Sequence, residues 1–380
     1  MISRICHAQS DAGHAQLHDT IVHGINDLIG GLCRSADIEP TSIYEACIVG
    51  NTTMNHLFLR LPVEQLGRAP YQAHSVEAHD VAPGDLGLDL NPRGNVHCVQ
   101  NIAGFVGADT VAAALAVDMD RVCDTTLVVD IGTNGELVLG TGSGLYAASC
   151  AAGPALEGAR IKQGGRAADG AIEAVVIDDG DITLDVIGTR APRSICGSGL
   201  IDAVAVLCDL GIIDETGRFA DPDAIAATLP KPIGSRLVES DGQPAFCLAW
   251  DGETAHPAVV LTQRDIREVQ LAKGAIRAGI RILLDKLDLS DADIDRVLLA
   301  GAFGNYIRSY SAVRIGLLPN VPLERIHFVG NAAAAGAQVL LLSDECRQRA
   351  ADVADRTQYV EIAHEATFAE VFADAMFLRP

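Results

Sequence analysis

Basic residues are scarce in this sequence. Its 28 lysines and arginines stand against 50 aspartates and glutamates, so the net charge is −22, and the basic residues form no cluster. Nucleic acids and anionic membrane surfaces attract proteins through a positive footprint. We therefore expect neither as a partner, and we interpret the acidic charge as a solubility feature.

Closely spaced cysteines are also absent. The ten cysteines are scattered, and the nearest two, Cys196 and Cys208, are twelve positions apart. This spacing excludes zinc-ribbon and ferredoxin motifs, so we expect reduced, mainly structural thiols and no iron–sulfur cluster in this chain. A metal site remains an alternative for four N-terminal histidines, two of which are spaced for one helical face: His7, His14, His18 and His23.

No segment has the apolar length of a membrane span. The best candidate, residues 326–343, contains His327, Asn331 and Gln338, which hydrocarbon would leave without hydrogen bonds. The first seven residues lack the apolar core and cleavage site of a signal peptide. We expect a cytoplasmic protein without a membrane partner. Its composition, 49% hydrophobic and 21% charged, predicts a folded chain with room for two cores.

The hydrophobic pattern alternates between helix and strand. Apolar residues at helical spacing from Leu17 through Leu28 to Leu32 predict an amphipathic helix that faces a core. Further helices are expected at 54–61, 108–117, from the loop 196–199 to 210, at 263–287 and, buried, from 332. Strands are expected at 43–49, 96–99, 127–131, 136–139, 145–150, 174–178, 182–186, 296–300 and 326–329. This order predicts α/β layering with some parallel strand pairs.

A break near residues 121–124 divides the chain into two predicted lobes. Residues 1–124 form lobe I, in which 62–95 reads as a surface excursion because it is rich in Pro, Gly, Asp and His. Residues 125–380 form lobe II, with a second insert at 215–258. Both halves place a Gly/Thr/Asn loop after a strand, which is typical of a duplicated two-lobe fold.

The strongest chemical motif follows the strand at 127–131 and reads Asp130-Ile131-Gly132-Thr133-Asn134-Gly135-Glu136. A strand that ends in Asp and turns through two glycines and a Thr can hold N–H groups and a hydroxyl against phosphate oxygens, while the carboxylate binds Mg²⁺ or its water shell. Asn-Gly is also the strongest short hairpin signal. An ordinary hairpin, with Asp130 satisfying the turn, is therefore the alternative interpretation.

A second glycine motif follows the strand at 296–300. Gly301 and Gly304 would let a planar base or a ribose approach the backbone, and Phe303 could pack near that base. The helix before this strand has a core stripe and a second face with several polar residues, and a solvated charged face is the default interpretation of that face. The residues concerned are Arg267, Gln270, Gly274, Arg277 and Arg281, with Lys273 at the margin.

Seven motifs together resemble the ATPase domain of the reductive activators of corrinoid proteins, and their order covers nearly the whole chain. They are Gly50-Asn51-Thr52-Thr53-Met54, Gly104-Phe105-Val106-Gly107-Ala108-Asp109, Asp130 to Glu136, Ala152-Gly153-Pro154-Ala155-Leu156-Glu157-Gly158, Ile195-Cys196-Gly197-Ser198-Gly199, Gly301-Ala302-Phe303-Gly304 and Gly330-Asn331-Ala332-Ala333.

The resemblance implies two ribonuclease H-like lobes that clamp ATP, as in the superfamily of acetate and sugar kinases, heat-shock chaperones and actin. It implies catalytic roles for Asp130 and Glu136, with Asp130 also at Mg²⁺. The implied ATP-binding residues are Gly132, Thr133, Asn134, Gly135, Gly153, Glu157, Gln270, Lys273, Gly301, Phe303, Gly304 and Asn305. Possible first-lobe contacts are Asn51, Thr52, Thr53 and Asp109. Glu157 and Asp109 could position the attacking water or cap a helix or turn.

The implied function is ATP-dependent reductive activation. An inactive Co(II) corrinoid, on a methyltransferase or its corrinoid subunit, would be returned to Co(I). The ATPase would supply conformational work, and an iron–sulfur domain or protein would supply the electron.

The chain departs from complete members of the family in its first part. Those members carry an N-terminal iron–sulfur module and a first phosphate loop of the DIGTTT kind, and neither stands in this sequence. We therefore expect an incomplete lobe I, weak or absent ATP hydrolysis, and a homodimer that covers an exposed sheet edge. Two other functions remain open: an activator of another enzyme, such as a 2-hydroxyacyl-CoA dehydratase, and a non-catalytic pair of lobes that docks a corrinoid protein.

Overall fold

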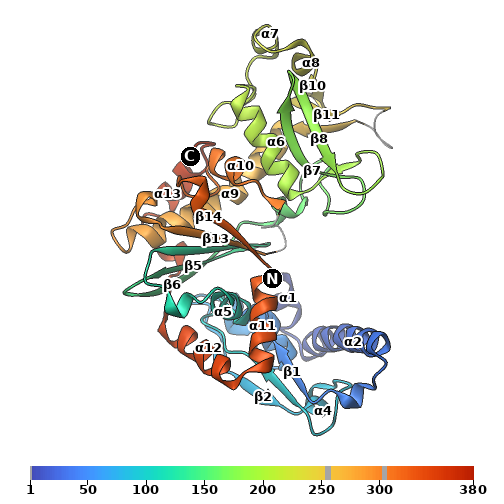
Figure 1. Cartoon of the computed structure of the whole chain (residues 1–380), viewed down its shortest axis with the longest axis vertical. Helices are drawn as coiled ribbons and strands as arrows, with labels where there is room; N and C mark the ends of the chain where they lie inside the picture. Colours follow the sequence, from blue (N-terminus) through green and yellow to red (C-terminus); the bar gives the residue numbers. More distant parts are fainter. Residues whose placement is uncertain (1, 253–257, 302–305) are drawn as a thin grey trace. The chain divides into compact units, whose positions relative to one another are not determined.

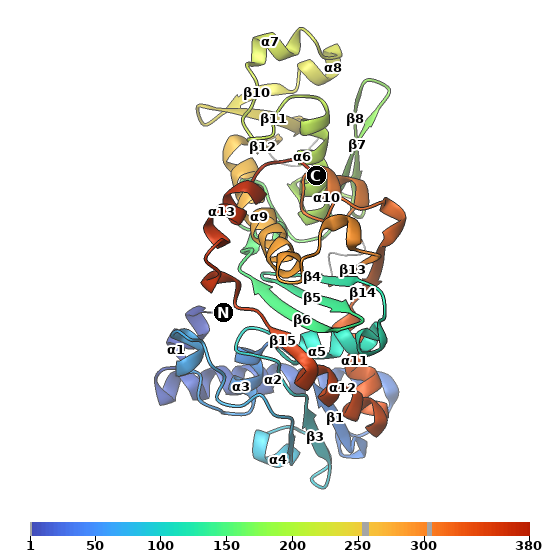
Figure 2. The ribbon, with the colours of Figure 1, turned by 90° about the vertical axis from the view of Figure 1, so that its left-hand side faces the viewer.

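The computed structural model describes residues 2–252, 258–301 and 306–380. The chain divides into two compact units (Figures 1 and 2). Unit 1 comprises Met1–Thr126, Val138–Ala148 and Asn331–Val360, and unit 2 comprises Leu127–Leu137, Ser149–Gly330 and Glu361–Pro380. Each unit is an α/β assembly, and each is described by itself.

Unit 1 contains a three-stranded sheet of order β1-β3-β2. Strand β1 (Glu45–Ile48) pairs in parallel with β3 (Asn95–Cys98), and β2 (His79–Val81) pairs antiparallel with β3. The expected strands at 43–49 and 96–99 are thus confirmed. The region 62–95 is more than a surface excursion, because it supplies β2 and the buried residues Leu66 and Leu86.

The helices of the first part of unit 1 are α1 (Ile2–His7), α2 (Asp11–Ala36), α3 (Thr52–Phe58), α4 (Pro83–Leu86) and α5 (Ala108–Ala116). Helix α2 begins where the Ser10 side chain accepts a hydrogen bond from the Gly13 N–H, which is a typical N-cap. The prediction that its whole apolar stripe faces a core is wrong at two positions. Leu28 and Leu32 are each 69% exposed, because the core-facing side of α2 carries Val22, Ile29 and Cys33 instead.

Two late helices also belong to unit 1: α11 (Ala332–Leu342) and α12 (Asp344–Arg356). Both pack against α5, and Figures 1 and 2 show the three helices side by side. A Cβ at Gly336 would lie 2.0 Å from the Ala112 carbonyl oxygen, so glycine allows α11 and α5 to touch. The predicted lobe boundary at residue 124 therefore misses the return of the chain to unit 1.

Helix α11 is less buried than predicted. Only Ala332, Gly336 and Leu340 are buried along it, and Leu342 is 84% exposed. One face of α11 meets α5, and its other apolar residues point to solvent. The strands β6 (Gly144–Cys150) and β15 (Thr357–Tyr359) of unit 1 pair in parallel.

The sheet of unit 2 has neighbouring strands in the order β14-β13-β4-β5. They are β14 (Ile326–Gly330), β13 (Arg296–Ala300), β4 (Thr126–Ile131) and β5 (Gly135–Thr141), and β13 and β14 are parallel. The predicted hairpin, the strand at 296–300 and the strand at 326–329 are confirmed. Both β4 and β13 end next to a glycine-containing loop, so the sheet places these two motifs at strand ends.

Helix α9 (Gln263–Asp285) covers this sheet, as predicted for residues 263–287. It begins with a capping box, in which Thr262 and Asp265 exchange side-chain and backbone hydrogen bonds. Two glycines allow close packing: a Cβ at Gly135 would lie 2.7 Å from Ile276, and one at Gly279 would lie 2.3 Å from the Cys150 sulfur. The sheet and α9 therefore hold the hairpin loop in place.

The rest of unit 2 consists of smaller layers. Helix α6 (Gly197–Asp209) packs on a sheet of order β8-β7-β9, and a second small sheet has the order β10-β11-β12. The strands are β7 (Ala171–Asp178), β8 (Asp181–Val186), β9 (Ser194–Ile195), β10 (Leu237–Ser240), β11 (Gln243–Ala249) and β12 (Val259–Thr262). The remaining helices are α7 (Pro222–Ala226), α8 (Lys231–Gly234), α10 (Ser309–Arg314) and α13 (Phe368–Ala375).

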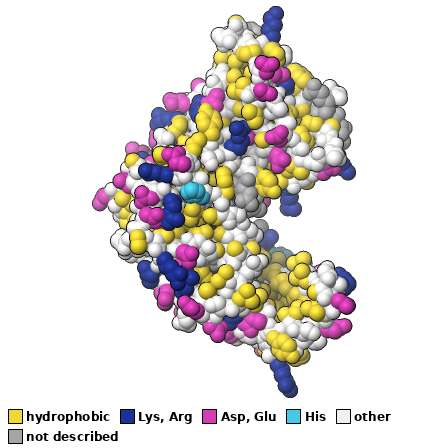
Figure 3. Space-filling view, in the orientation of Figure 1, with side chains coloured by type: hydrophobic (Ala, Val, Ile, Leu, Met, Phe, Trp, Pro, Cys, Tyr) yellow, Lys and Arg dark blue, Asp and Glu magenta, His cyan; other side chains and the backbone are white. Residues whose placement is uncertain are grey.

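The surface carries no continuous basic field on the face drawn in Figure 3, where Lys and Arg side chains lie among Asp and Glu. None of the helices formed by the described residues combines the length and the apolarity needed to cross a bilayer.

Candidate functional site

The loop between β4 and β5 is a tight hairpin turn. The Gly132 N–H donates to the Asn134 carbonyl at 2.9 Å, and Asp130 stands half-buried near the end of β4. Thr133 at the tip is exposed. The loop thus presents a hydroxyl and backbone groups to solvent from a rigid base, which is the arrangement that phosphate binding requires.

Gly301 lies directly beside Asp130. It has a φ of +93°, and a Cβ at this position would come within 2.5 Å of the Asp130 Oδ1 atom. The Gly301 N–H donates to the Gly330 carbonyl at 2.9 Å, which fixes the end of β13. The structure therefore brings together Asp130 and Gly301, which begin two motifs and are 171 positions apart in the sequence. Phe303, Gly304 and Asn305 lie outside the described residues.

A third motif, Gly153 to Gly158, positions Glu157 at the hairpin. Gly153 and Gly158 have φ values of +76° and +82°, and the short 3₁₀ turn Pro154–Glu157 lies between them. The Thr133 hydroxyl donates a hydrogen bond to the Glu157 carboxylate. A charge-assisted bond of this kind orients the hydroxyl at the tip of the loop.

Glu157 also lines a cavity of about 240 Å³ in unit 2, together with Arg166, Glu173, Cys196, Ser198 and Tyr306 among others. Cys196 and Ser198 stand at the start of α6, which has no side-chain cap. A helix N-terminus offers free N–H groups and a partial positive charge, and both favour an anion. The cavity therefore combines donors for phosphate with two carboxylates.

The sequence analysis missed four of these lining residues. Ser198 belongs to one of the seven family motifs and to a predicted helix start, but no role was assigned to it; the cap-free N-terminus of α6 was the available signal. Arg166, Glu173 and Tyr306 come from separate segments and carry no local signal. Only the tertiary fold of unit 2 brings them to one cavity.

Gln270 and Lys273, predicted to contact the base and ribose, are both 1% exposed. The Gln270 amide donates to the carbonyls of Thr216 (3.1 Å) and Met376 (2.8 Å), and the Lys273 ammonium donates to the Phe377 carbonyl. Burial lowers the pKa of Lys273 to about 7. In this structure both side chains face the C-terminal segment, and their contact with a nucleotide stays a prediction.

The four predicted first-lobe residues lie in unit 1. Asn51 caps α3 by accepting from the Met54 N–H at 3.0 Å, and the Thr52 hydroxyl donates to the Ala103 carbonyl at 2.6 Å. The Asp109 carboxylate accepts from the Thr110 N–H at 2.9 Å, and burial raises its pKa. A Cβ at Gly107 would lie 2.5 Å from Asn51, so the two motifs of unit 1 touch.

The cysteines and histidines hold no metal cluster within residues 2–252, 258–301 and 306–380. Cys150 is buried, and burial raises the pKa of its thiol, as for an inert core residue. His18 is buried between the carbonyls of Leu57 and Leu86, and His14 binds the Leu61 carbonyl. These contacts explain the two histidines structurally.

The residues present fit a nucleotide phosphate with its Mg²⁺ ion. The space between Asp130 and Gly301 would be filled by a Cβ at position 301. The cavity lined by Glu157 offers the Ser198 hydroxyl, helix N–H groups and Arg166. Hard carboxylate oxygens such as those of Asp130 and Glu157 are the ligand type that Mg²⁺ prefers, usually through water. The Ser149 hydroxyl donates to the Glu136 Oε1 at 3.4 Å, and the catalytic role expected for Glu136 stays a prediction.

Comparison with known proteins covers both units. Residues 124–380 match the family described as the C-terminal domain of RACo, the ASKHA domain, and residues 1–122 match the RACo middle region. A solved structure named reductive activator for corrinoid, iron-sulfur protein has a TM-score of 0.87 at 36% identity. It aligns over 99% of this chain and 59% of its own.

Two further relatives are also named for the activation or reduction of corrinoid proteins. The corrinoid activation enzyme RamQ of Eubacterium limosum is 38% identical over 375 residues, which is 98% of this chain and 62% of that protein. The [Co(II) methylated amine-specific corrinoid protein] reductase of Methanosarcina barkeri is 29% identical over 286 residues, 69% of this chain and 45% of that protein. The chain thus spans about three fifths or less of the length of these relatives.

Proposed function

The chain belongs to the RACo family of reductive activators, with an actin-like ASKHA domain, and we propose that it binds Mg-ATP at the phosphate loop of unit 2 and uses it in returning a Co(II) corrinoid protein to Co(I). The names of its relatives supply the substrate class, a corrinoid protein. The residues of the site supply the nucleotide part of the proposal.

The main support for a nucleotide site is that three motifs meet near Asp130. Gly301 leaves room for the Asp130 carboxylate, and the Thr133 hydroxyl at the tip of the same loop is held by Glu157. Three motifs that are distant in sequence therefore meet around one carboxylate and one oriented hydroxyl. A hairpin without a ligand would need neither the close approach of Gly301 nor the external carboxylate of Glu157.

Each residue has a role that its chemistry allows. The backbone N–H groups of Thr133 and Asn134 and the start of α6 hold phosphate oxygens, and the Thr133 hydroxyl joins them when phosphate takes its hydrogen bond from Glu157. Mg²⁺, when bound, neutralises phosphate charge, and Asp130 holds its water shell. Glu157 orients the Thr133 hydroxyl and is placed to accept a proton from a water in the adjacent cavity. Arg166 adds positive charge at the cavity wall.

The coupling to corrinoid reduction needs an electron from outside these residues. Co(II) becomes Co(I) by gaining one electron, so the partner set includes a low-potential donor, which we propose to be an iron–sulfur domain or protein. Mg-ATP would then drive the conformational part of the transfer, at the weak turnover expected from the sequence.

Isothermal titration calorimetry with Mg-ATP tests the nucleotide site. We expect one saturable site in the purified chain and at least about tenfold weaker binding in Asp130→Asn, a loss of about 1.4 kcal/mol. The matched control is Asp178→Asn, which makes the same charge change at an exposed carboxylate at the end of β7. Absence of any Mg-ATP binding by the folded wild type would favour the non-catalytic docking function.

The corrinoid part is tested separately. The wild type is mixed with a Co(II) corrinoid protein and a low-potential reductant, with or without Mg-ATP, and the appearance of Co(I) is followed by UV–visible spectroscopy. We expect the ATP-dependent fraction to disappear in Asp130→Asn and to remain in Asp178→Asn. Mg-ATP binding without any effect on the cobalt spectrum would instead indicate activation of another class of enzyme.

A further inference from the structure

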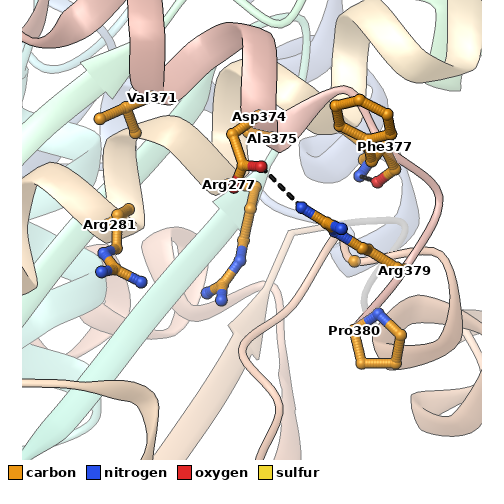
Figure 4. A pocket seen from close by; sticks show the side chains of 10 residues that line it. Arg277, Arg281, Val371, Asp374, Ala375, Phe377, Arg379 and Pro380 are labelled. Carbon is orange, nitrogen blue, oxygen red and sulfur yellow. Dashed lines mark hydrogen bonds and ion pairs between the residues drawn. The ribbon is translucent and has the colours of Figure 1, made fainter. Parts of the chain in front are cut away.

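A second cavity of unit 2, of about 250 Å³, is lined by side chains of α9 and by the C-terminal segment. Figure 4 shows Arg277 and Arg281 extending from one side and Arg379 from the other. Lys273 completes the set, and Asp374 is the acidic residue in the lining. This cavity shares no lining residue with the cavity beside Glu157, and Lys273 is the one member of its lining that was also predicted to contact ATP.

The three cations of α9 stand at positions i, i+4 and i+8. Lys273, Arg277 and Arg281 therefore share one face of the helix. Like charges at this spacing destabilise a helix, so such a stripe needs compensating negative charge. Carboxylates supply part of it: Arg277 pairs with Asp291 at 2.6 Å and Arg281 with Asp285 at 2.9 Å.

Lys273 is the cation that these carboxylates do not compensate. It is 1% exposed, and among the described residues no carboxylate lies within ion-pair distance of its ammonium group. Its one hydrogen bond goes to the Phe377 carbonyl, which leaves two of its three N–H donors for the cavity. A buried charge without a counter-charge is costly, and the lowered pKa of Lys273 expresses that cost.

The arginines also keep donors free. Arg277 spends two N–H groups on Asp291. Arg379 spends one on Asp374 at 2.7 Å, also lies 3.7 Å from a Glu215 oxygen and stacks over the Phe377 ring, whereas each guanidinium has five N–H groups. Gly316 contributes space: with a φ of +69°, it lies where a Cβ would come within 3.2 Å of the Lys273 Nζ atom. Donors from two chain segments thus surround a small hollow.

We propose that this cavity binds a small tetrahedral oxyanion of the phosphate or sulfate class. The lining is cationic and rich in N–H donors, and its volume is below that of the pockets that hold nucleotides and drug-sized ligands, roughly 300 to 1,000 Å³. The bound oxyanion supplies the counter-charge that Lys273 lacks and bridges α9 to the C-terminal segment. Arginine and lysine together are the side chains that proteins use for such anions.

The test is a calorimetric titration of the purified chain with inorganic phosphate, without Mg²⁺ and at ionic strength held constant with sodium chloride. We expect one saturable site, weakened at least about tenfold in Arg281→Gln and lost in Lys273→Met. Arg281 is more than half exposed, so its variant folds even if the Lys273 variant does not. Sulfate should bind as phosphate does, and acetate should not.

Two controls separate this cavity from other phosphate sites. Arg267→Gln removes the same charge from an exposed position of α9 outside the cavity and should leave phosphate binding unchanged. Thr133→Val alters the proposed nucleotide loop and should also leave it unchanged, while Arg281→Gln should leave Mg-ATP binding unchanged. The proposal is overturned by no saturable phosphate binding, by binding of acetate alone, by equal weakening in Arg267→Gln, or by loss in Thr133→Val.

Discussion

Around the two motifs of unit 1, polar side chains are enclosed, whereas around the loop between β4 and β5 of unit 2 they reach the surface. Within the described residues, buried atoms of Thr53, Asn55 and Thr110 in unit 1 have no hydrogen-bond partner, and the same holds for one atom each of Asp202 on α6 and Gln270 on α9 in unit 2. In unit 2, Thr133 is exposed and bonded to Glu157 beside a cavity. Buried polar groups without partners cost stability, so proteins keep few of them.

The difference indicates two kinds of motif. The polar residues of unit 1 hold two loops together: Gly107 touches Asn51, and Thr52 bonds to Ala103. The polar residues of unit 2 leave donors and carboxylates accessible to a ligand. Substitutions in the motifs of unit 1 should therefore act on folding, and those in unit 2 should act on binding.

The largest expected loss of stability comes from steric packing in unit 1. Gly336→Ala should lower the free energy of unfolding by about 3 kcal/mol, because the new Cβ would lie 2.0 Å from the Ala112 carbonyl and force α11 away from α5. Urea denaturation measures it. Gly24→Ala is the control: nothing lies within 4 Å of its Cβ, so this variant of α2 should gain up to about 1 kcal/mol. Equal stability of the two variants would contradict the packing described here.

A pH effect in unit 1 comes next. The His56 Nδ1–H donates to Thr52, and its Nε2 atom accepts from the N–H groups of His74 (3.1 Å) and Ser75 (3.3 Å), so the neutral ring is required. Burial lowers its pKa from 6.5 to about 4. Between these values the unfolded chain binds more protons, so stability is present above pH 6.5 and falls as the pH drops to about 4.

The expected loss is on the order of 3 kcal/mol. It is measured as the unfolding free energy of wild type minus that of His56→Gln across this pH range, because other groups titrate in both proteins. If this difference in unfolding free energy stays constant across the pH range, His56 takes up its proton in the folded chain as it does in the unfolded chain, and the folded ring is charged.

The phosphate loop is tested by a pair of glycines in unit 2. Gly301→Ala should cost about 2 kcal/mol and weaken Mg-ATP binding, because it combines backbone strain with a contact of 2.5 Å to Asp130. Gly242→Ala also has a positive φ, of +73°, but nothing lies within 4 Å of its Cβ, so it should cost about 1 kcal/mol. Calorimetry on both variants separates strain from the contact. Unchanged Mg-ATP affinity in Gly301→Ala would place the nucleotide elsewhere.

The sequence predicted local features better than long-range ones. The Asn134-Gly135 turn and the capped helix α9 follow from neighbouring residues, and both are present. The return of α11 and α12 to unit 1 depends on contacts such as Gly336 with Ala112, which no local pattern encodes. Exposure of Leu28 and burial of Lys273 likewise depend on which distant segment covers a helix. The lining residues Arg166 and Tyr306 were missed for the same reason.

The smallest effects come from one substitution made in both units, which tests the comparison most directly. Thr52→Val keeps the shape of a buried side chain but removes the donor to the part-buried Ala103 carbonyl, so unit 1 should lose about 1 to 2 kcal/mol of stability. Thr133→Val, at an exposed tip, should change stability by less than about 0.5 kcal/mol yet weaken Mg-ATP binding about tenfold. Denaturation gives the stability of each variant, and calorimetry gives its Mg-ATP affinity. If Thr133→Val instead destabilises the chain as much as Thr52→Val while Mg-ATP binding is unchanged, the loop of unit 2 is structural, and the contrast between the units fails.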